Sequence, residues 1–362
     1  MRTTLILHLL CILKVNSIFA FTDTSSADKN NLAVFPIVAR SIETGWAFGI
    51  VNSLTFRPFK KDTTTRTSSL QLIGLYTTNK QLICVLNGTT YFKKEKYVLN
   101  YQVSYSNFPD KFWGMGKYAE NKNMEKYSFR QFYFYNHLQR KIWKQFFGGG
   151  ILEYQRVMDI HYTPGGLFDQ QQIVGRNGYR VMGIGASITY DTRNHAFIPN
   201  KGAYAQGAVT HFNPIFGSDY LYTNIVVDAK KYIQVYKKHV LALRAYGFIN
   251  VGNEIPLRSQ AALGGANEMR GYYDGRYKDN NMILAMMEYR VPIYRRFGAA
   301  FFCSGGNVGK TLSDVNFEAF KFCYGSGIRF ALNRKEKLNL RIDYGFSLSK
   351  SNGLYLEIAE AF

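Results

Sequence analysis

Few of the side chains that could carry out chemistry stand in a pattern that a reaction requires. The stretch SGGNVGKT ends like a phosphate-binding loop, but Ser304 stands where that pattern needs a glycine, and no helix is expected after it. His161 and His195 fall in connections with no Ser or Asp pattern that would complete a nucleophilic triad. The cysteines are too few for a disulfide scaffold and lack metal-ligand spacing. We therefore expect no enzyme, cofactor or metal site.

One polar loop raises a different chemical question. The stretch GGANEMRGYYDGRYKDNN, residues 264–281, carries Arg270, Gly271 and Tyr272 between further glycines and charges. An arginine guanidinium presents a rigid fork of donors suited to carboxylates, and a neighbouring glycine lets the chain pass close to another surface. The alternative is an exposed arginine in a mobile loop. The elements around the loop decide between the two.

Length and composition limit what those elements are. The chain has 362 residues, of which 46% are hydrophobic, so it should fold. Residues 1–20 read as a signal peptide, with Arg2 before an apolar centre and a cleavage site ending at Ala20, and residues 21–30 follow as a short periplasmic segment. The alternative for 1–20 is a short buried helix. No later apolar run of about 18 residues predicts a membrane helix.

The remaining choices are a soluble secreted protein and a membrane β-barrel. An aromatic content of 16%, with 27 Tyr and 28 Phe, is typical of the pleated surfaces and aromatic girdles of outer-membrane barrels. In KLNLRIDYGFSLS the apolar face runs from Leu338 to Leu348, while the other face carries Arg341 and Asp343. MGIGASITYD and HVLALRAYGFI show the same alternation. A polar face that holds both an Arg and an Asp favours a lumen over a sandwich core.

Runs of this kind, separated by turn signals, predict about sixteen strands. They fall near 31–40, 43–57, 66–78, 80–92, 96–107, 125–138, 142–158, 178–191, 202–213, 219–234, 238–251, 281–294, 297–309, 316–332, 337–349 and 353–362. An even number lets the first and last strands pair antiparallel and close the sheet. We therefore expect an all-β, antiparallel transmembrane barrel of outer-membrane type over residues 31–362.

The connections between these strands alternate in length and charge. Long ones are expected at 108–124, 159–177, 252–280 and 310–315, and the short ones on the other rim carry Lys and Arg. This basic collar comprises Lys60, Lys61, Lys93, Lys94, Lys237, Lys238, Arg295 and Arg296. The net charge of +20 is thus attributed largely to a periplasmic rim and not to a nucleic-acid site. The collar should contact outer-membrane lipid headgroups, and the alternative is an acidic periplasmic protein.

Four stretches carry a family resemblance. LGGANEMRGYYDGRY follows the eleventh expected strand, and ASITYDTRNHAFIPNKGAYAQ forms an expected strand–turn–strand. MMEYRVPIYRRFGAAFFCSGGNVG and GSGIRFAL…LRIDYGFS…LYLEIAEAF follow in order. Together they resemble the BamA/TamA superfamily of outer-membrane assembly and translocation barrels, also called bacterial surface antigens. The matches are its sixth extracellular loop with an Arg-Gly-aromatic motif, a turn motif at Asp191, Arg193, Pro199 and Gly202, its next hairpin and its last three strands.

The resemblance implies a place for the arginine. In that family the loop is tucked into the lumen, and its Arg meets a carboxylate on the barrel wall. The usual acidic residue of the thirteenth strand is replaced here by Ser304, which can be at most a neutral hydrogen-bond partner. We therefore expect Arg270 to pair with Glu288 or Asp343, which have the parity to face inward.

The resemblance also implies a sorting signal and a function. The sorting signal would comprise Leu354, Leu356, Ile358 and Phe362 on one lipid-facing side of the last strand, interrupted by Glu360. The implied function is insertion or transport of client polypeptides at the outer membrane, where the first and last strands part. Family members with this function carry periplasmic receptor modules, for which residues 21–30 leave no room, so a separate periplasmic partner is expected. The alternative is a passive pore or structural surface-antigen barrel without a client.

Overall fold

A computed structural model describes residues 31–362 apart from 60–64, 196–197, 334–337 and 359. The predicted signal peptide and the segment 21–30 lie outside the described residues, as do Lys60 and Lys61 of the basic collar. No helix in the described part of the chain is long and apolar enough to cross a membrane.

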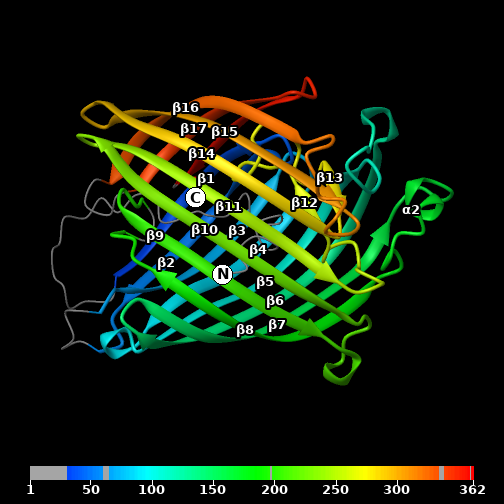
Figure 1. Cartoon of the computed structure of the whole chain (residues 1–362), viewed down its shortest axis with the longest axis horizontal. Helices are drawn as coiled ribbons and strands as arrows, with labels where there is room; N and C mark the ends of the chain where they lie inside the picture. Colours follow the sequence, from blue (N-terminus) through cyan, green and yellow to red (C-terminus); the bar gives the residue numbers. More distant parts are fainter. Residues whose placement is uncertain (1–30, 60–64, 196–197, 334–337, 359) are drawn as a thin grey trace.

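The described residues form a closed antiparallel barrel of sixteen strands (Figure 1). The strands are β1 (Asn31–Ser41), β2 (Gly45–Phe56), β3 (Ser68–Thr77), β4 (Leu82–Tyr91), β5 (Tyr97–Phe112), β6 (Glu125–Trp143), β7 (Phe146–His161), β8 (Tyr179–Asp191), β9 (Gly202–Phe212), β10 (Tyr222–Tyr236), β11 (His239–Val251), β14 (Asn281–Tyr294), β15 (Phe297–Gly309), β16 (Lys321–Asn333), β17 (Leu338–Ser347) and β18 (Asn352–Ile358). Each pairs with its neighbour in the sequence, and β1 pairs with β18 to close the sheet. This architecture confirms the predicted fold class.

Shorter elements lie in the connections. They are β12 (Ala261–Leu263), β13 (Tyr277–Asp279), α2 (Leu167–Gln170) and the 3₁₀ turns η1 (Lys93–Glu95), η2 (Asn121–Asn123) and η3 (Pro214–Phe216). β12 and β13 pair with each other in a small sheet of their own between β11 and β14. Figure 1 shows this sheet and α2 toward the same end of the barrel, at the right of the view.

Side-chain burial alternates along the strands because successive residues point to opposite faces. On β17, Ile342 and Tyr344 are 41% and 40% exposed, whereas Arg341 and Asp343 are fully buried. β11 follows the same rule, with Arg244 buried and Ala245 exposed. The apolar faces therefore point outward and the polar faces line the interior, as the sequence pattern predicts.

Several predicted boundaries differ from the structure by four or more residues. On the collar side, β6 ends at Trp143 and not near 138, and β7 begins at Phe146 and not near 142. On the opposite rim two more differ. β16 begins at Lys321 and not near 316, because other hydrogen bonds hold residues 316–318: the Glu318 amide donates to the Asn316 side chain at 3.0 Å, and the Asn307 side chain donates to the Asn316 and Glu318 carbonyls at 2.8 and 2.9 Å. β5 continues to Phe112, since its last residues pair with β6 as far as Phe112 opposite Glu125. The connections at this rim are correspondingly longer after β15 and shorter after β5 than expected.

The described members of the basic collar share one rim. They lie in the connections β4–β5, β10–β11 and β14–β15, at the end of the barrel where β1 begins and β18 ends. All of them are exposed: Lys93, Lys94, Lys237, Lys238, Arg295 and Arg296. The position of the collar follows from the topology, whereas its binding partner remains a prediction.

Candidate functional site

The connection 252–280, here called the lumen loop, is folded into the barrel. Every residue from Ser259 to Tyr273 is buried. At one side the Gly271 amide donates to the Tyr355 hydroxyl on β18 at 2.9 Å, and at the other the Tyr273 hydroxyl donates to Asp110 on β5 at 3.0 Å. Because β5 and β18 lie in separate parts of the wall, the loop spans the lumen and is not an exposed connection.

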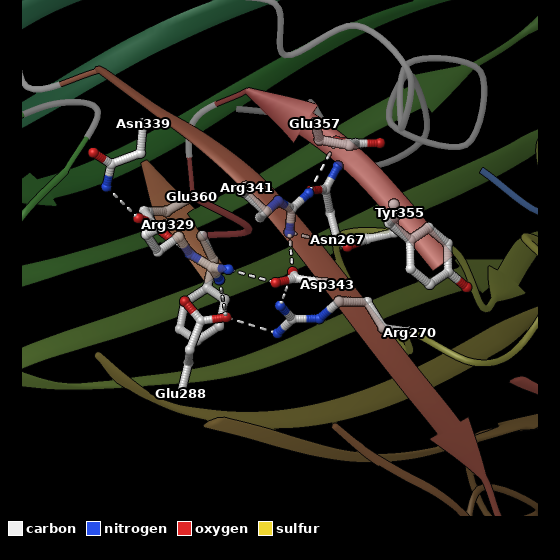
Figure 2. Close-up of polar contacts among 12 residues, drawn as sticks. Asn267, Arg270, Glu288, Arg329, Asn339, Arg341, Asp343, Tyr355, Glu357 and Glu360 are labelled. Atoms are coloured by element: carbon white, nitrogen blue, oxygen red, sulfur yellow. Dashed lines mark hydrogen bonds and ion pairs between the residues drawn. The ribbon is translucent and has the colours of Figure 1, made fainter. Parts of the chain in front are cut away.

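Arg270 is held by two strands at once (Figure 2). Its Nη1 donates to Asp343 on β17 at 2.6 Å, and its Nη2 donates to Glu288 on β14 at 2.7 Å. All three side chains are fully buried. The two carboxylates named as alternatives in the sequence therefore both bind this guanidinium, which uses the fork geometry that lysine lacks.

The thirteenth barrel strand contributes a ring in place of an acid. The Phe302 ring lies under Arg270, with the guanidinium carbon 3.3 Å from the ring centroid. Ser304, two residues further along β15, is buried, and within the described residues no hydrogen bond joins it to Arg270. Ser304 was expected to be at most a neutral hydrogen-bond partner, and among the described residues its hydroxyl forms no such bond. Phe302 provides a cation–π contact instead, and the acids come from other strands.

Three further arginines complete a buried network around this pair (Figure 2). Arg329 binds Asp343 and also donates to Glu360 at 2.8 Å. Arg341 donates to Glu357 at 2.9 Å, and Arg290 donates to Glu288 at 2.8 Å. The four cations of this network, Arg270, Arg290, Arg329 and Arg341, are matched by four carboxylates, Glu288, Asp343, Glu357 and Glu360. Buried charges are tolerated when they are paired and hydrogen-bonded in this way.

Gly271 lets the loop reach the wall. Its φ is +112°, in the left-handed region, and a Cβ at this position would lie 2.8 Å from the backbone carbon of Phe346 on β17. Any larger residue would therefore push the loop away from the strand. The Gly271 carbonyl accepts from the Ser351 hydroxyl at 2.7 Å, so both of its backbone polar groups are satisfied at the wall.

Tyr272, the third residue of the motif, is also buried. Its hydroxyl donates to the Phe322 carbonyl on β16 at 3.3 Å. The motif thus contacts β14, β15, β16, β17 and β18, which make up the part of the wall that ends at the seam.

A second anchor ties the lumen loop to the start of the barrel. The Asp274 amide donates to the Glu43 carboxylate, in the turn between β1 and β2, at 2.8 Å. Burial and the neighbouring Asp274 charge raise the pKa of Glu43 to about 7. Burial and the charge of Asp110 raise the pKa of Asp274 to about 8. Sequence reasoning missed this contact because the two residues are far apart in the chain and no local pattern joins them.

The chain end differs from the prediction. β18 ends at Ile358, whose side chain lies outside the described part, and Phe362 is buried and not on the lipid-facing side with Leu354 and Leu356. The Phe362 carbonyl accepts from Arg290 at 2.8 Å, and Glu360 is buried beside Arg329. The strand alternation was extended too far: the buried arginines draw the last residues inward. The clue in the sequence was Glu360, which breaks the apolar face.

The turn motif lies on the collar side, between β8 and β9. Asp191 binds Arg193 with two bonds of 2.9 Å to the guanidinium. Gly202 has φ +103°, and a Cβ there would lie 2.2 Å from the Thr192 carbonyl oxygen. Pro199 is buried in the same connection. The four residues thus build one compact turn, and a role for it in function remains a prediction.

The seam between β1 and β18 is short. Arg40 lies opposite Leu356, so Ile358, where β18 ends, falls opposite Val38. β1 extends beyond this point, from Val38 back to Asn31. Its opposite edge pairs with β2 along the whole length of β1. Among the described residues, no strand covers the outer edge of β1 from Asn31 to Ile37.

No group of three or more His, Cys, Asp or Glu side chains within the described ranges could hold a metal ion. The network itself joins the loop to the wall through ion pairs and hydrogen bonds.

Comparison with known proteins agrees with this architecture. The Omp85 superfamily domain model matches residues 73–358, and the chain therefore belongs to the Omp85 superfamily. This confirms the predicted resemblance and identifies an outer-membrane barrel from a family of assembly and transport proteins rather than enzymes. No curated protein matches the sequence significantly.

Solved structures show the same fold at low identity. BamA from Haemophilus ducreyi lacking POTRA domains 1–3 has a TM-score of 0.60 and 15% identity, covering 91% of this chain and 70% of that one. CdiB from Acinetobacter baumannii has a TM-score of 0.56 and 12% identity, covering 92% and 65%. CdiB from Escherichia coli has a TM-score of 0.60 and 11% identity, covering 92% and 68%. At these identities the likeness is one of fold.

Proposed function

We propose that this barrel inserts or transports client polypeptides at the outer membrane, and that clients pass at the seam between β1 and β18. The observation that carries the proposal is that no strand in the described part of the chain covers the edge of β1 from Asn31 to Ile37, beside a short β18. A free strand edge presents a row of backbone donors and acceptors that an extended peptide can pair with. A closed pore has no use for such an edge.

The lumen loop supports the same function by its position. Arg270 fixes it to β14 and β17, and Gly271 fixes it to β18. Asp274 joins it to the turn that follows β1. The loop therefore contacts the wall on both sides of the seam. In the proposed cycle a client strand pairs first along the free edge of β1, and the seam at Arg40 and Leu356 parts as pairing extends.

A periplasmic protein partner belongs to this proposal. The basic collar lies on the rim beside the free edge of β1, where a protein that delivers clients would dock. Outer-membrane lipid headgroups are the competing ligand for the same charges. Replacing Lys237 and Lys238 by Gln and recovering crosslinked proteins tests the docking role. Recovery equal to that of the unchanged protein would assign the collar to lipid alone.

The proposal includes export with cleavage of residues 1–20. Amino-terminal sequencing of the purified outer-membrane protein is expected to begin at Phe21. A mature protein that begins at Met1 would contradict it.

Depletion of the protein followed by quantitative outer-membrane proteomics tests the function. We expect selective loss of other surface proteins, restored by re-expression of the unchanged chain. An intact proteome with altered solute uptake would contradict the proposal and favour the passive pore.

A further inference from the structure

A cavity of about 330 Å³ opens on the rim opposite the basic collar. Its polar wall includes Lys117 from the β5–β6 connection, Arg276 and Tyr277 from the lumen loop, Lys321 from the start of β16 and Ser349 from the β17–β18 turn. We propose that this cavity, here called the mouth cavity, binds a phosphate group. This inference is independent of whether the barrel handles client polypeptides.

Arg276 places a buried positive charge at the cavity. Its side chain is only 6% exposed, and its guanidinium carbon lies 5.0 Å from the Trp113 ring centroid and 4.5 Å from that of Tyr277. Its hydrogen bonds go to the Asn121 side-chain oxygen at 2.7 and 3.0 Å and to the Ala119 carbonyl at 2.7 Å. These acceptors are all neutral.

The remaining nitrogen of Arg276 has no acceptor. Nη1 is buried without a hydrogen-bond partner among the described residues. Burial lowers the pKa of Arg276, and only Tyr277 and Tyr272 act against that effect. No carboxylate in the described residues therefore balances this guanidinium.

Lys321 adds a second charge to the same ring. Its Nζ lies 4.5 Å from the centroid of Tyr277, which Arg276 also contacts. Two positive charges on one ring repel each other, and an anion bound between them would offset that repulsion.

Lys117 is the third cation of the cavity. It donates to the Asp314 carbonyl and the Asn316 side chain, both at 3.0 Å, and reaches Glu318 only at 3.8 Å. The one acid that lines the cavity, Glu120, pairs with Lys122 at 2.7 Å. The cavity wall is therefore positive on balance.

The chemistry of this wall fits a phosphate. The guanidinium and ammonium groups that line this cavity provide charge and donors for phosphate oxygens, and Tyr277 and Ser349 offer hydroxyls. The volume is in the range of small-ligand pockets, so a phosphate can enter with an attached sugar or glycerol. Either a lipid headgroup of the outer leaflet or a soluble phosphate ester supplies that group.

Titration calorimetry of the purified full-length protein with inorganic phosphate tests the site. We expect binding that weakens with added salt and that falls at least about tenfold in Lys321→Gln, as for loss of a charge-assisted contact. Arg276→Gln, the second variant, should weaken it as well, provided its heat-modifiable gel mobility shows a folded barrel. The matched control is Lys310→Gln, an exposed lysine on the same rim outside the cavity wall, which should bind as the unchanged protein does.

Native mass spectrometry from phosphatidylglycerol nanodiscs separates the two sources. Lipid retained by the unchanged protein and lost in Lys321→Gln assigns the site to a headgroup, and phosphate binding without retained lipid assigns it to a soluble ester. Equal phosphate binding by the unchanged protein and Lys321→Gln, or no binding by the unchanged protein, would overturn the proposal.

Discussion

Replacing Arg270 with Ala removes the central contact between the lumen loop and the wall. The substitution deletes the bonds to Asp343 at 2.6 Å and Glu288 at 2.7 Å, together with the contact to the Phe302 ring. It also leaves the network with one cation fewer than carboxylates. The barrel strands themselves keep their backbone pairing, so we expect the loop to undock while the sheet remains closed.

The structure sets the size of this effect. Two charge-assisted hydrogen bonds contribute about 1.5–3 kcal/mol each, and breaking a buried ion pair costs about 3–5 kcal/mol. In the variant, Glu288 is still paired with Arg290, and Asp343 is still paired with Arg329 and Arg341. Neither carboxylate is left without a cation, so the loss of free energy is smaller than the sum of these contributions. We expect docking of the loop to weaken by roughly 3–4 kcal/mol, a factor of several hundred at 1.4 kcal/mol per tenfold.

Amide hydrogen exchange of residues 264–276 in the detergent-solubilised protein measures this directly. Exchange in the loop should accelerate by about that factor while the β6–β7 amides stay protected, and heat-modifiable gel mobility should report a barrel that unfolds more readily. Arg180→Ala is the matched control, because that arginine forms only an exposed ion pair with Asp219 at 3.5 Å and should change little. Loop exchange in Arg270→Ala equal to that of the unchanged protein would refute the anchoring role.

Two further predictions concern the neighbours of Arg270. Gly271→Ala should also accelerate loop exchange, because its Cβ would strike the Phe346 backbone. The control is Gly217→Ala, whose φ is also positive but whose Cβ would meet open space, so it should cost only about 1 kcal/mol of local strain. Equal losses of local stability in the two variants would mean that the positive φ alone explains the effect. The Glu43 carboxyl has its pKa raised to about 7, above its ordinary value of 4.5, so its contribution to stability is full below about pH 4.5 and is lost as pH rises through about 7. Exchange at the Asp274 amide should therefore be faster at pH 8 than at pH 5 after correction for intrinsic rates. Glu43→Gln should reduce that difference without abolishing it, because the pKa of Asp274 is itself raised to about 8; a pH dependence that the substitution leaves unchanged would place its origin outside Glu43.

Much of the barrel follows from local sequence. Alternation such as that around Arg341 and Asp343 predicts both that the segment is a strand and which face each residue lies on. Period-2 patterning indicates the strand, and a lipid exterior requires the apolar side chains to point outward. Parity also put Glu288 and Asp343 inside, which restricted the partners of Arg270 to the two that bind it. The choice of partner also rested on the family resemblance, which implies that the loop arginine meets a carboxylate on the barrel wall.

What the sequence could not predict depends on packing inside the lumen. The inward positions of Glu360 and Phe362 are set by Arg329 and Arg290, which come from other strands and need acceptors there. The bond between Glu43 and the Asp274 amide joins residues that are 231 positions apart in the chain. Neither contact has a periodic signal, because an irregular segment takes whatever path satisfies the buried charges around it.

Locking the seam tests the central claim that clients pass between β1 and β18. Residues directly opposite in antiparallel strands have Cα atoms about 4.5–5.5 Å apart, within disulfide range, so Arg40→Cys with Leu356→Cys can be crosslinked in a chain whose own cysteines are replaced by Ala. The control crosslinks Ala229→Cys with Ala245→Cys, a pair on β10 and β11 away from the seam.

The measurement is restoration of the outer-membrane proteome in depleted cells by each variant. The account predicts that the oxidised seam variant reaches the membrane folded but fails to restore the other surface proteins, that reduction rescues it, and that the β10–β11 crosslink is harmless. Full restoration by the oxidised seam variant, with the disulfide verified on gels, would contradict the account.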